Sequence, residues 1–201
     1  MEKSTSGSEQ QTSRRNIRAP SNLSTSAPGV ITWREEWTLH VEFMDADHRL
    51  LAQYLGRIAR DFDRCIAWKS RPGAERMLAA LETLGELTRQ HFRREEEVMH
   101  LAEYPLLDAH AAEHELLLAE HTELMRAIGS SGSEGLAPTT LTALAQWLFG
   151  HILDDDRTLA LYLRRSGFAT AEPAPLTLPA SAASIDCGSG PAQPRRSAYR
   201  W

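Results

Sequence analysis

The sequence predicts an all-α fold, an antiparallel up-down four-helix bundle over residues 30–169, with a non-helical N-terminal arm and disordered tails. Three observations predict it. Apolar residues recur at helical spacing in four segments, Pro- and Gly-containing stretches separate these segments, and both ends of the chain are almost free of large apolar groups. Connections this short between helices of this length favour antiparallel neighbours.

The first predicted helix follows Asp45, which we expect to be its N-cap. Its apolar residues lie three or four positions apart, as one buried helix face requires. They are Leu51, Leu55, Ile58, Ala59, Phe62 and Ile66. We expect Trp33 and Trp37, which precede this helix, to pack across one end of the bundle.

The second predicted helix follows a break at Arg71-Pro72-Gly73. Its periodic positions are Met77, Leu81, Leu84, Thr88, Phe92, Val98 and Met99. The third has Pro105 in its first turn and ends near Gly129. Its apolar positions are Leu106, Leu107, Leu117, Leu118, Leu124, Met125 and Ile128.

The fourth predicted helix begins at Pro138, after a loop rich in glycine and serine, and ends near Gly167. Its apolar positions are Leu141, Leu144, Leu148, Ile152, Leu159 and Leu163. With this helix, the bundle accounts for residues 30–169. Residues 1–29 and 170–201 are too polar, or too rich in Ala, Pro and Ser, to offset the entropy of ordering, so we predict disordered tails.

Charge and composition exclude several classes of function. Residues 30–169 contain 15 Lys and Arg against 23 Asp and Glu, so the predicted domain is a poor binder of nucleic acid. No apolar run approaches the roughly 18 residues that would span a bilayer, so we expect no membrane partner. Cys65 and Cys187 show no metal or disulfide spacing, which favours a cytoplasmic location.

Every predicted helix carries a histidine among its core-facing residues. With about 100° between successive residues, these histidines lie among the apolar positions of their helices, and Glu95 lies beside one of them. The histidines are His48, His91, His110, His114 and His151. A single histidine on an apolar face is more often a satisfied core residue than a ligand. Five in one bundle predict a metal site, because each buried imidazole needs partners for both nitrogens.

Carboxylates near these histidines predict a pair of cations in the core. Glu95 and an aspartate from the segment HILDDD would supply anionic oxygens, and imidazole with carboxylate suits iron. Bundle cores are where di-iron sites are built. On a regular helix Asp155 lies about 40° from His151, whereas Asp156 lies about 140° away, so helical geometry alone favours Asp155.

Four segments resemble the signature of the hemerythrin family, of the bacterial single-domain kind. They are DADHRLL around His48, HFRREEEVM from His91, YPLLDAHAAEH ending at His114, and WLFGHILDDD from Trp147. The resemblance covers roughly residues 30–165. The segment before His48 has Glu42 where family members commonly have glycine, so we expect a differently shaped entry to the first helix.

The resemblance implies a di-iron cofactor and its ligands. His110, His114 and His151 would hold one iron, and His48 and His91 the other. Glu95 and Asp156 would bridge the two irons beside an oxo or hydroxo group. Because the family pattern selects Asp156 rather than Asp155, we expect a π-bulge or an underwound turn after His151.

The resemblance also implies that dioxygen binds at the iron held by two histidines. Leu148 matches a residue of the family's oxygen pocket, and we expect Leu118 to line the same pocket. We therefore expect a non-catalytic protein that stores, delivers or senses dioxygen. One alternative is a di-iron enzyme, with peroxidase, oxidase or nitric-oxide-handling activity, for which peroxide or nitric oxide would be the partner. The other is a sensor that binds a protein partner through the C-terminal tail.

Three further histidines have no place in this set. His121 lies two turns, about 10 Å, beyond His114, so we expect it to be a polar residue of the core or the bundle end. His100 faces away from His91 and is expected to be solvated. His40 precedes the first helix and receives no role. We interpret Glu96 and Glu97 as part of an outward charged face.

Overall fold

The structure is a computed structural model that describes residues 33–64, 71–131, 138–168 and 175–178. Nearly all of both predicted tails, and the residues Cys65, Ile66 and Cys187, lie outside the described residues. Within the predicted C-terminal tail, residues 175–178 are described, and Leu178 packs against the apolar core. This part of the tail therefore contacts the helices.

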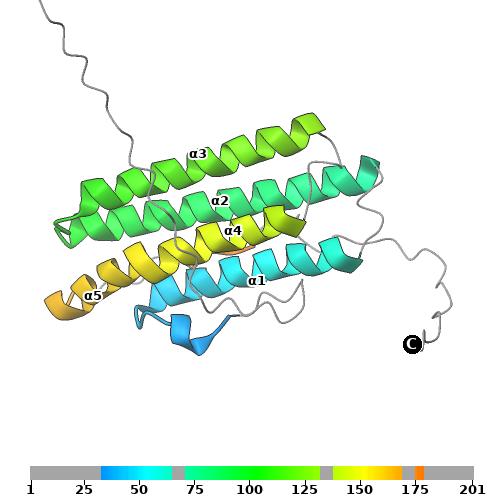
Figure 1. Cartoon of the computed structure of the whole chain (residues 1–201). Coiled ribbons are helices and arrows are strands. Elements are labelled where there is room, and N and C mark those ends of the chain that lie inside the picture. The colour runs from blue at the N-terminus through cyan, green and yellow to red at the C-terminus, as the bar shows by residue number, and fades with distance from the viewer. Residues whose placement is uncertain (1–32, 65–70, 132–137, 169–174, 179–201) are drawn as a thin grey trace, which may run out of the picture.

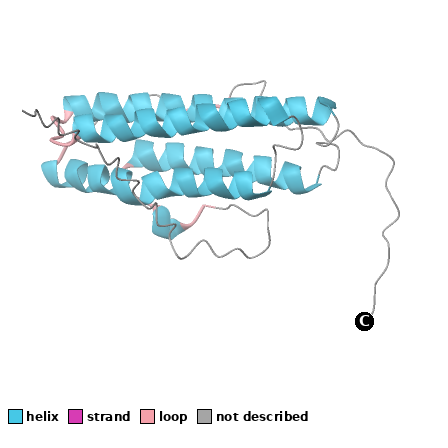
Figure 2. Cartoon of the chain, turned by 45° about the horizontal axis from the view of Figure 1, so that its top comes forward, coloured by secondary structure: helices cyan, strands magenta, loops and turns pink. Residues whose placement is uncertain are grey.

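The described residues form helices and no strands, so the predicted all-helical bundle is confirmed at this level (Figures 1 and 2). The elements are η1 (Glu35–Trp37), α1 (Glu42–Arg64), α2 (Arg71–Leu101), α3 (Leu107–Ser131), α4 (Pro138–His151), the π-helical turn η4 (Ile152–Asp156) and α5 (Arg157–Ser166). The elements α4, η4 and α5 follow one another without a gap and form one long rod. In Figure 1 this rod lies alongside α1, α2 and α3. No described helix is long and apolar enough to cross a membrane.

The first helix begins before the predicted cap. Glu42 is the first residue of α1, so the prediction of Asp45 as N-cap is wrong. The Asp45 carboxylate instead reaches back and accepts hydrogen bonds from the backbone N–H groups of Leu39, at 2.7 Å, and His40, at 2.9 Å. Asp45 therefore fixes the chain that enters α1.

Two other predicted boundaries differ by a few residues. The predicted break at Arg71 is the first turn of α2, where a following proline is tolerated because the first N–H groups have no helical partner. The next helix, α3, begins at Leu107, and Leu106 lies in the preceding turn with 51% of its surface exposed, so its assignment to the core is wrong. The predicted end at Gly167 is confirmed, since this residue adopts φ of 66° directly after α5.

Apolar side chains form two clusters in the bundle. The larger joins α1, α2 and α4 with parts of α3, and it includes Leu55, Leu84 and Phe149. The smaller gathers the beginning of α1, the end of α2 and α5 around Met44, Met99 and Leu159. At this second cluster the Tyr162 hydroxyl donates to the carbonyls of the turn between α2 and α3. The polar site described below lies among these apolar residues.

The N-terminal arm contains the short 3-10 helix η1, so its prediction as non-helical is wrong. Trp37 packs on Phe149 with ring centroids 4.3 Å apart, and Trp33 packs on Trp37 at 5.7 Å. Trp33 also lies parallel to the His48 ring at 6.4 Å. The two tryptophans therefore cover the side of the bundle beside α1 and α4 rather than one of its ends.

His121 fills a space that Gly85 provides in the opposite helix. Its Nε2–H donates to the Leu81 carbonyl at 3.2 Å, and its ring lies 6.1 Å from that of Trp147. A Cβ atom on Gly85 would lie only 2.4 Å from the imidazole Cε1. The histidine thus connects α2, α3 and α4, and the expectation that it is a polar core residue is confirmed.

We predict that Gly85→Ala lowers the free energy of unfolding by about 1–3 kcal/mol, because the imidazole must leave its place. Gly129→Ala is the matched control, since nothing lies within 4 Å of its added Cβ, and alanine should raise stability by up to about 1 kcal/mol. Urea unfolding of both variants measures the difference. Equal stability of Gly85→Ala and the wild type would contradict the contact.

Candidate metal centre

Five imidazoles and two carboxylates meet in the middle of the bundle. Each helical rod supplies at least one of them, and none is more than 5% exposed. They are His48 on α1, His91 and Glu95 on α2, His110 and His114 on α3, His151 on α4 and Asp156 at the end of η4. These are the seven residues selected from the sequence.

The seven side chains form two groups that share their carboxylates. In one group, potential ligand atoms of Glu95, Asp156 and three histidines lie within 4.8 Å of one another; the histidines are His110, His114 and His151. In the other group, potential ligand atoms of the same two carboxylates and of His48 and His91 also lie within 4.8 Å of one another. Two neighbouring cations could therefore be held, one with five side-chain ligands and one with four.

Glu95 divides its two oxygens between the groups. Oε1 lies 3.5 Å from His91 Nε2, and Oε2 lies 3.4 Å from His114 Nε2. The spacing of four residues places His91 and Glu95 on one face of α2, where both side chains reach the interior. The carboxylate has the placement of a bridge between two cations.

Asp156 divides its oxygens in the same way from the other side. Its Oδ2 lies 3.1 Å from His48 Nε2, and its Oδ1 lies 2.9 Å from His151 Nε2. The π-helical turn η4 explains how a residue five positions after His151 reaches the same site, because i→i+5 hydrogen bonds close each of its turns. The predicted π-bulge is therefore confirmed.

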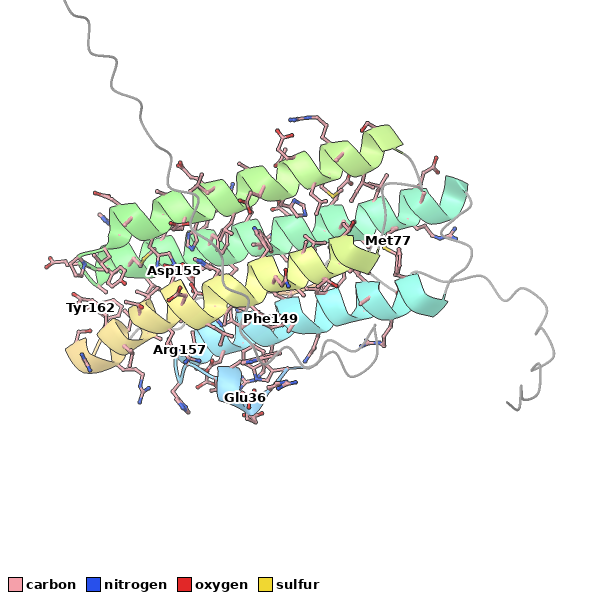
Figure 3. All side chains as sticks on the ribbon, viewed as in Figure 1. Glu36, Met77, Phe149, Asp155, Arg157 and Tyr162 are labelled. Carbon is pink, nitrogen blue, oxygen red and sulfur yellow. The ribbon has the colours of Figure 1, made fainter. Side chains whose placement is uncertain are left out.

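Asp155, which helical geometry alone favoured, lies outside the cluster. Its side chain is 39% exposed, and its Oδ2 lies 3.5 Å from His151 Nδ1, the ring nitrogen that faces away from the centre. Asp156, in contrast, is fully buried. Asp155 is labelled in Figure 3. The widened turn has exchanged the positions that a regular helix would give these two residues.

The polar atoms at the centre lack hydrogen-bond partners among the described residues. The buried atoms without such a partner include both oxygens of Glu95, both oxygens of Asp156 and Nε2 of His110, although imidazole nitrogens lie nearby. A buried carboxylate without a partner costs several kcal/mol, whereas a bound cation would satisfy it. The donor set therefore fits a metal pair better than a purely structural role.

Pairs of imidazole nitrogens face each other at the centre. Nε2 of His48 lies 3.1 Å from Nε2 of His91, and the same distance separates His114 and His151. Metal–imidazole bonds of about 2.1 Å place two ligands about 3.0 Å apart at a right angle and about 3.4 Å apart at a tetrahedral angle. The observed spacing lies between these two values, so each pair of imidazoles could share one cation.

Burial keeps two of the imidazoles neutral. It lowers the pKa of His91 to about 4, and burial together with the neighbouring imidazoles lowers the pKa of His114 to about 2. Neutral imidazole has the lone pair that a metal requires. Both rings are therefore in the ligating form at neutral pH.

The two carboxylates have opposite pKa shifts. Burial raises the pKa of Glu95 well above its ordinary value, and the Asp156 carboxylate adds to this rise. Burial also acts to raise the pKa of Asp156, but the surrounding imidazoles, His151 foremost, hold it well below its ordinary value. Two cations at this position would relieve the repulsion between the carboxylates.

Carboxylates outside the cluster contact the other nitrogens of the imidazoles. Asp47 Oδ2 lies 3.3 Å from His91 Nδ1, and Glu96 Oε1 lies 2.8 Å from His114 Nδ1. The prediction that Glu96 belongs to an outward charged face is wrong, because its carboxylate contacts His114. Sequence reasoning missed both contacts, although Asp47 directly precedes His48 and Glu96 directly follows Glu95.

The other predicted residues lie as follows. Leu148 is buried in the larger apolar cluster, and Leu118 is partly buried against it; that they line an oxygen pocket remains a prediction. His100 is exposed, as expected, and His40 precedes α1 with φ of 61°. Neither of these histidines belongs to the cluster.

Comparisons with known proteins agree with this geometry. A family model described as the hemerythrin HHE cation binding domain matches residues 39–163. A bacteriohemerythrin of Stenotrophomonas maltophilia (strain R551-3) is 26% identical over 131 residues, which cover 65% of this chain and 80% of the relative. A bacteriohemerythrin of Ralstonia nicotianae (strain ATCC BAA-1114 / GMI1000) is 27% identical over 138 residues, which cover 69% of this chain and 92% of the relative. No solved structure gives a significant match.

We predict that Asp156→Asn abolishes most of the rise in unfolding temperature that ferrous iron gives the wild-type chain. A ligand at 100 times its Kd stabilises the folded state by about 2.7 kcal/mol, and the neutral amide would weaken that binding. Thermal unfolding without oxygen, with and without iron, measures the effect. Asp155→Asn is the matched control and should keep the rise, so equal losses in both variants would contradict the placement of Asp156.

Proposed function

Because this chain belongs to the hemerythrin family, whose cofactor is a non-heme di-iron centre, we propose that it binds dioxygen reversibly. The family model covers more than half of the chain, so the resemblance predicted from the sequence is confirmed. The proposed ligands are the seven clustered residues. The observation that supports this proposal best is that two buried groups of imidazoles share both carboxylates.

The two groups differ in how many side chains they offer to a metal. The group with His110, His114 and His151 offers five ligands, whereas the group with His48 and His91 offers four. We propose that the second group leaves a position for an external ligand. When bound by the two groups together, a ferrous pair would supply the two electrons that dioxygen takes up on reversible binding.

The ligand set favours carriage of dioxygen over oxidative chemistry. Five imidazoles and two carboxylates provide few anionic oxygens, unlike the carboxylate-rich sites of ferritin-like proteins, which use Glu-x-x-His motifs. Buried apolar residues, Leu148 among them, would exclude water from the centre. We therefore propose storage, delivery or sensing of dioxygen, with no catalytic turnover, in the cytoplasm.

We also propose that the four rods run antiparallel in up-down order. The beginning of α1, the end of α2 and the last helix, α5, all contribute to the smaller apolar cluster, and Leu107 at the beginning of α3 packs against it. Elements that alternate in direction bring these particular ends together.

Repeated gas exchange tests the proposed function. The full chain is loaded with ferrous iron without oxygen, exposed to air, and returned to argon through several cycles. Reversible binding predicts charge-transfer absorption that appears in air and disappears under argon with constant amplitude. Irreversible oxidation in the first cycle, with consumption of peroxide or nitric oxide by the product, would contradict carriage and favour a di-iron enzyme.

We predict that Leu148→Ser speeds loss of the oxygenated spectrum while iron content stays at the wild-type value. The hydroxyl admits water to a region that the leucine keeps dry, and water promotes loss of the oxygenated state. Leu141→Ser is the matched control, because it is a buried leucine on the same helix about two turns from Leu148. Equal rates in Leu148→Ser and the wild type would exclude Leu148 from the oxygen pocket.

A further inference from the structure

Asp47 is a buried carboxylate beside the two-histidine group, outside the seven proposed ligands. It lies on α1 directly before His48 and is 1% exposed. Since neighbouring residues of a helix point about 100° apart, His48 faces the centre while Asp47 faces α2. There its Oδ2 lies 3.3 Å from His91 Nδ1.

The position of the His91 ring fixes which nitrogen must carry the proton. Its Nε2 faces the centre, 3.1 Å from His48 Nε2 and 3.5 Å from Glu95 Oε1. A nitrogen that binds a metal cannot carry a proton, so in a neutral ligating ring the proton is on Nδ1. Asp47 is the acceptor placed to receive this Nδ1–H.

Arg94 stabilises the charge that this role requires of Asp47. An isolated carboxylate at this depth would be costly, but the Arg94 guanidinium donates to both of its oxygens. Arg94 is 13% exposed, and its Cζ lies 5.7 Å from the centre of the Phe43 ring. Phe43 and Asp47 belong to α1, whereas His91 and Arg94 belong to α2, so the contacts also join these two helices.

The other carboxylates that contact the Nδ1 atom of a clustered histidine are more exposed to solvent. Glu96, which contacts His114, is 38% exposed, and Asp155, which contacts His151, is 39% exposed. His48 Nδ1 is buried with no hydrogen-bond partner among the described residues. Within the two-histidine group, and among the residues that the structure describes, a carboxylate outside the seven ligands thus contacts His91 but not His48. This carboxylate, that of Asp47, is almost completely buried.

We propose that Asp47, held by Arg94, is a positioning residue that fixes the orientation and proton location of His91, and so controls how tightly the two-histidine group retains its metal. This inference rests on the proposed di-iron function. It predicts an unequal effect: loss of Asp47 weakens one metal position more than the other, because His91 belongs to only one group.

Iron retention tests the proposal in the full iron-loaded chain. We expect Asp47→Ala to lose one of its two irons to a chelator 10–100-fold more readily than the wild type, as is typical for carboxylates that orient metal-binding histidines. The second iron should leave at close to the wild-type rate. Iron per chain, measured after timed exposure to the chelator, gives both values.

A spectroscopic measurement separates positioning from a general loss of stability. In the zinc-loaded, ¹⁵N-histidine-labelled chain, the His91 Nδ1–H should give a slowly exchanging proton resonance. This resonance should vanish in Asp47→Ala and persist in Asp47→Asn, because the amide oxygen still accepts the hydrogen bond. Iron retention in Asp47→Asn should be closer to that of the wild type for the same reason.

Glu86→Gln is the matched control, because it breaks an exposed ion pair with Arg89 on the same helix and should change neither measurement. Should Asp47→Ala fail to fold, Arg94→Met tests the same link by removing the cation that holds Asp47. Wild-type retention of both irons in the folded variants, with the resonance unchanged, would overturn the proposal. A wild-type chain that binds no metal would overturn the proposed function itself.

Discussion

Two carboxylates buried side by side in an apolar bundle are the constraint on which the rest of the structure depends. Glu95 and Asp156 are completely buried, and their oxygens have no hydrogen-bond partner among the described residues. Apolar clusters lie around them, so bulk solvent does not reach the carboxylates. The five surrounding imidazoles complete a donor set that fits a pair of cations, and metal binding would then be coupled to the stability of the fold.

Helix geometry brings these groups together from distant parts of the chain. On α2 and α3, spacings of four residues place two polar groups on one face. On the fourth rod the spacing is five, and the π-helical turn η4 compensates for the extra residue. A regular helix there would direct Asp155 inward and expose Asp156, which would leave the second bridging position to a different side chain.

The surroundings of the two proposed metal positions differ. On the side with three histidines, Glu96 and Asp155 contact imidazoles from partly exposed positions. On the side with two histidines, Asp47 and Arg94 form a buried pair behind His91. This side also offers one ligand fewer, and it is the side at which we propose that an external molecule binds.

The sequence by itself determined the helical class, the seven clustered residues and the family, because these depend on periodicity and on residue type at fixed spacing. The π-helical turn could also be predicted from the sequence, because the family pattern selects Asp156 whereas a regular helix favours Asp155. Only the tertiary structure decided which side chains from different helices meet, such as Asp47 with His91, Glu96 with His114, and His121 in the space left by Gly85. These contacts depend on the rotation and height of one helix relative to another, which the periodicity of a single helix does not encode.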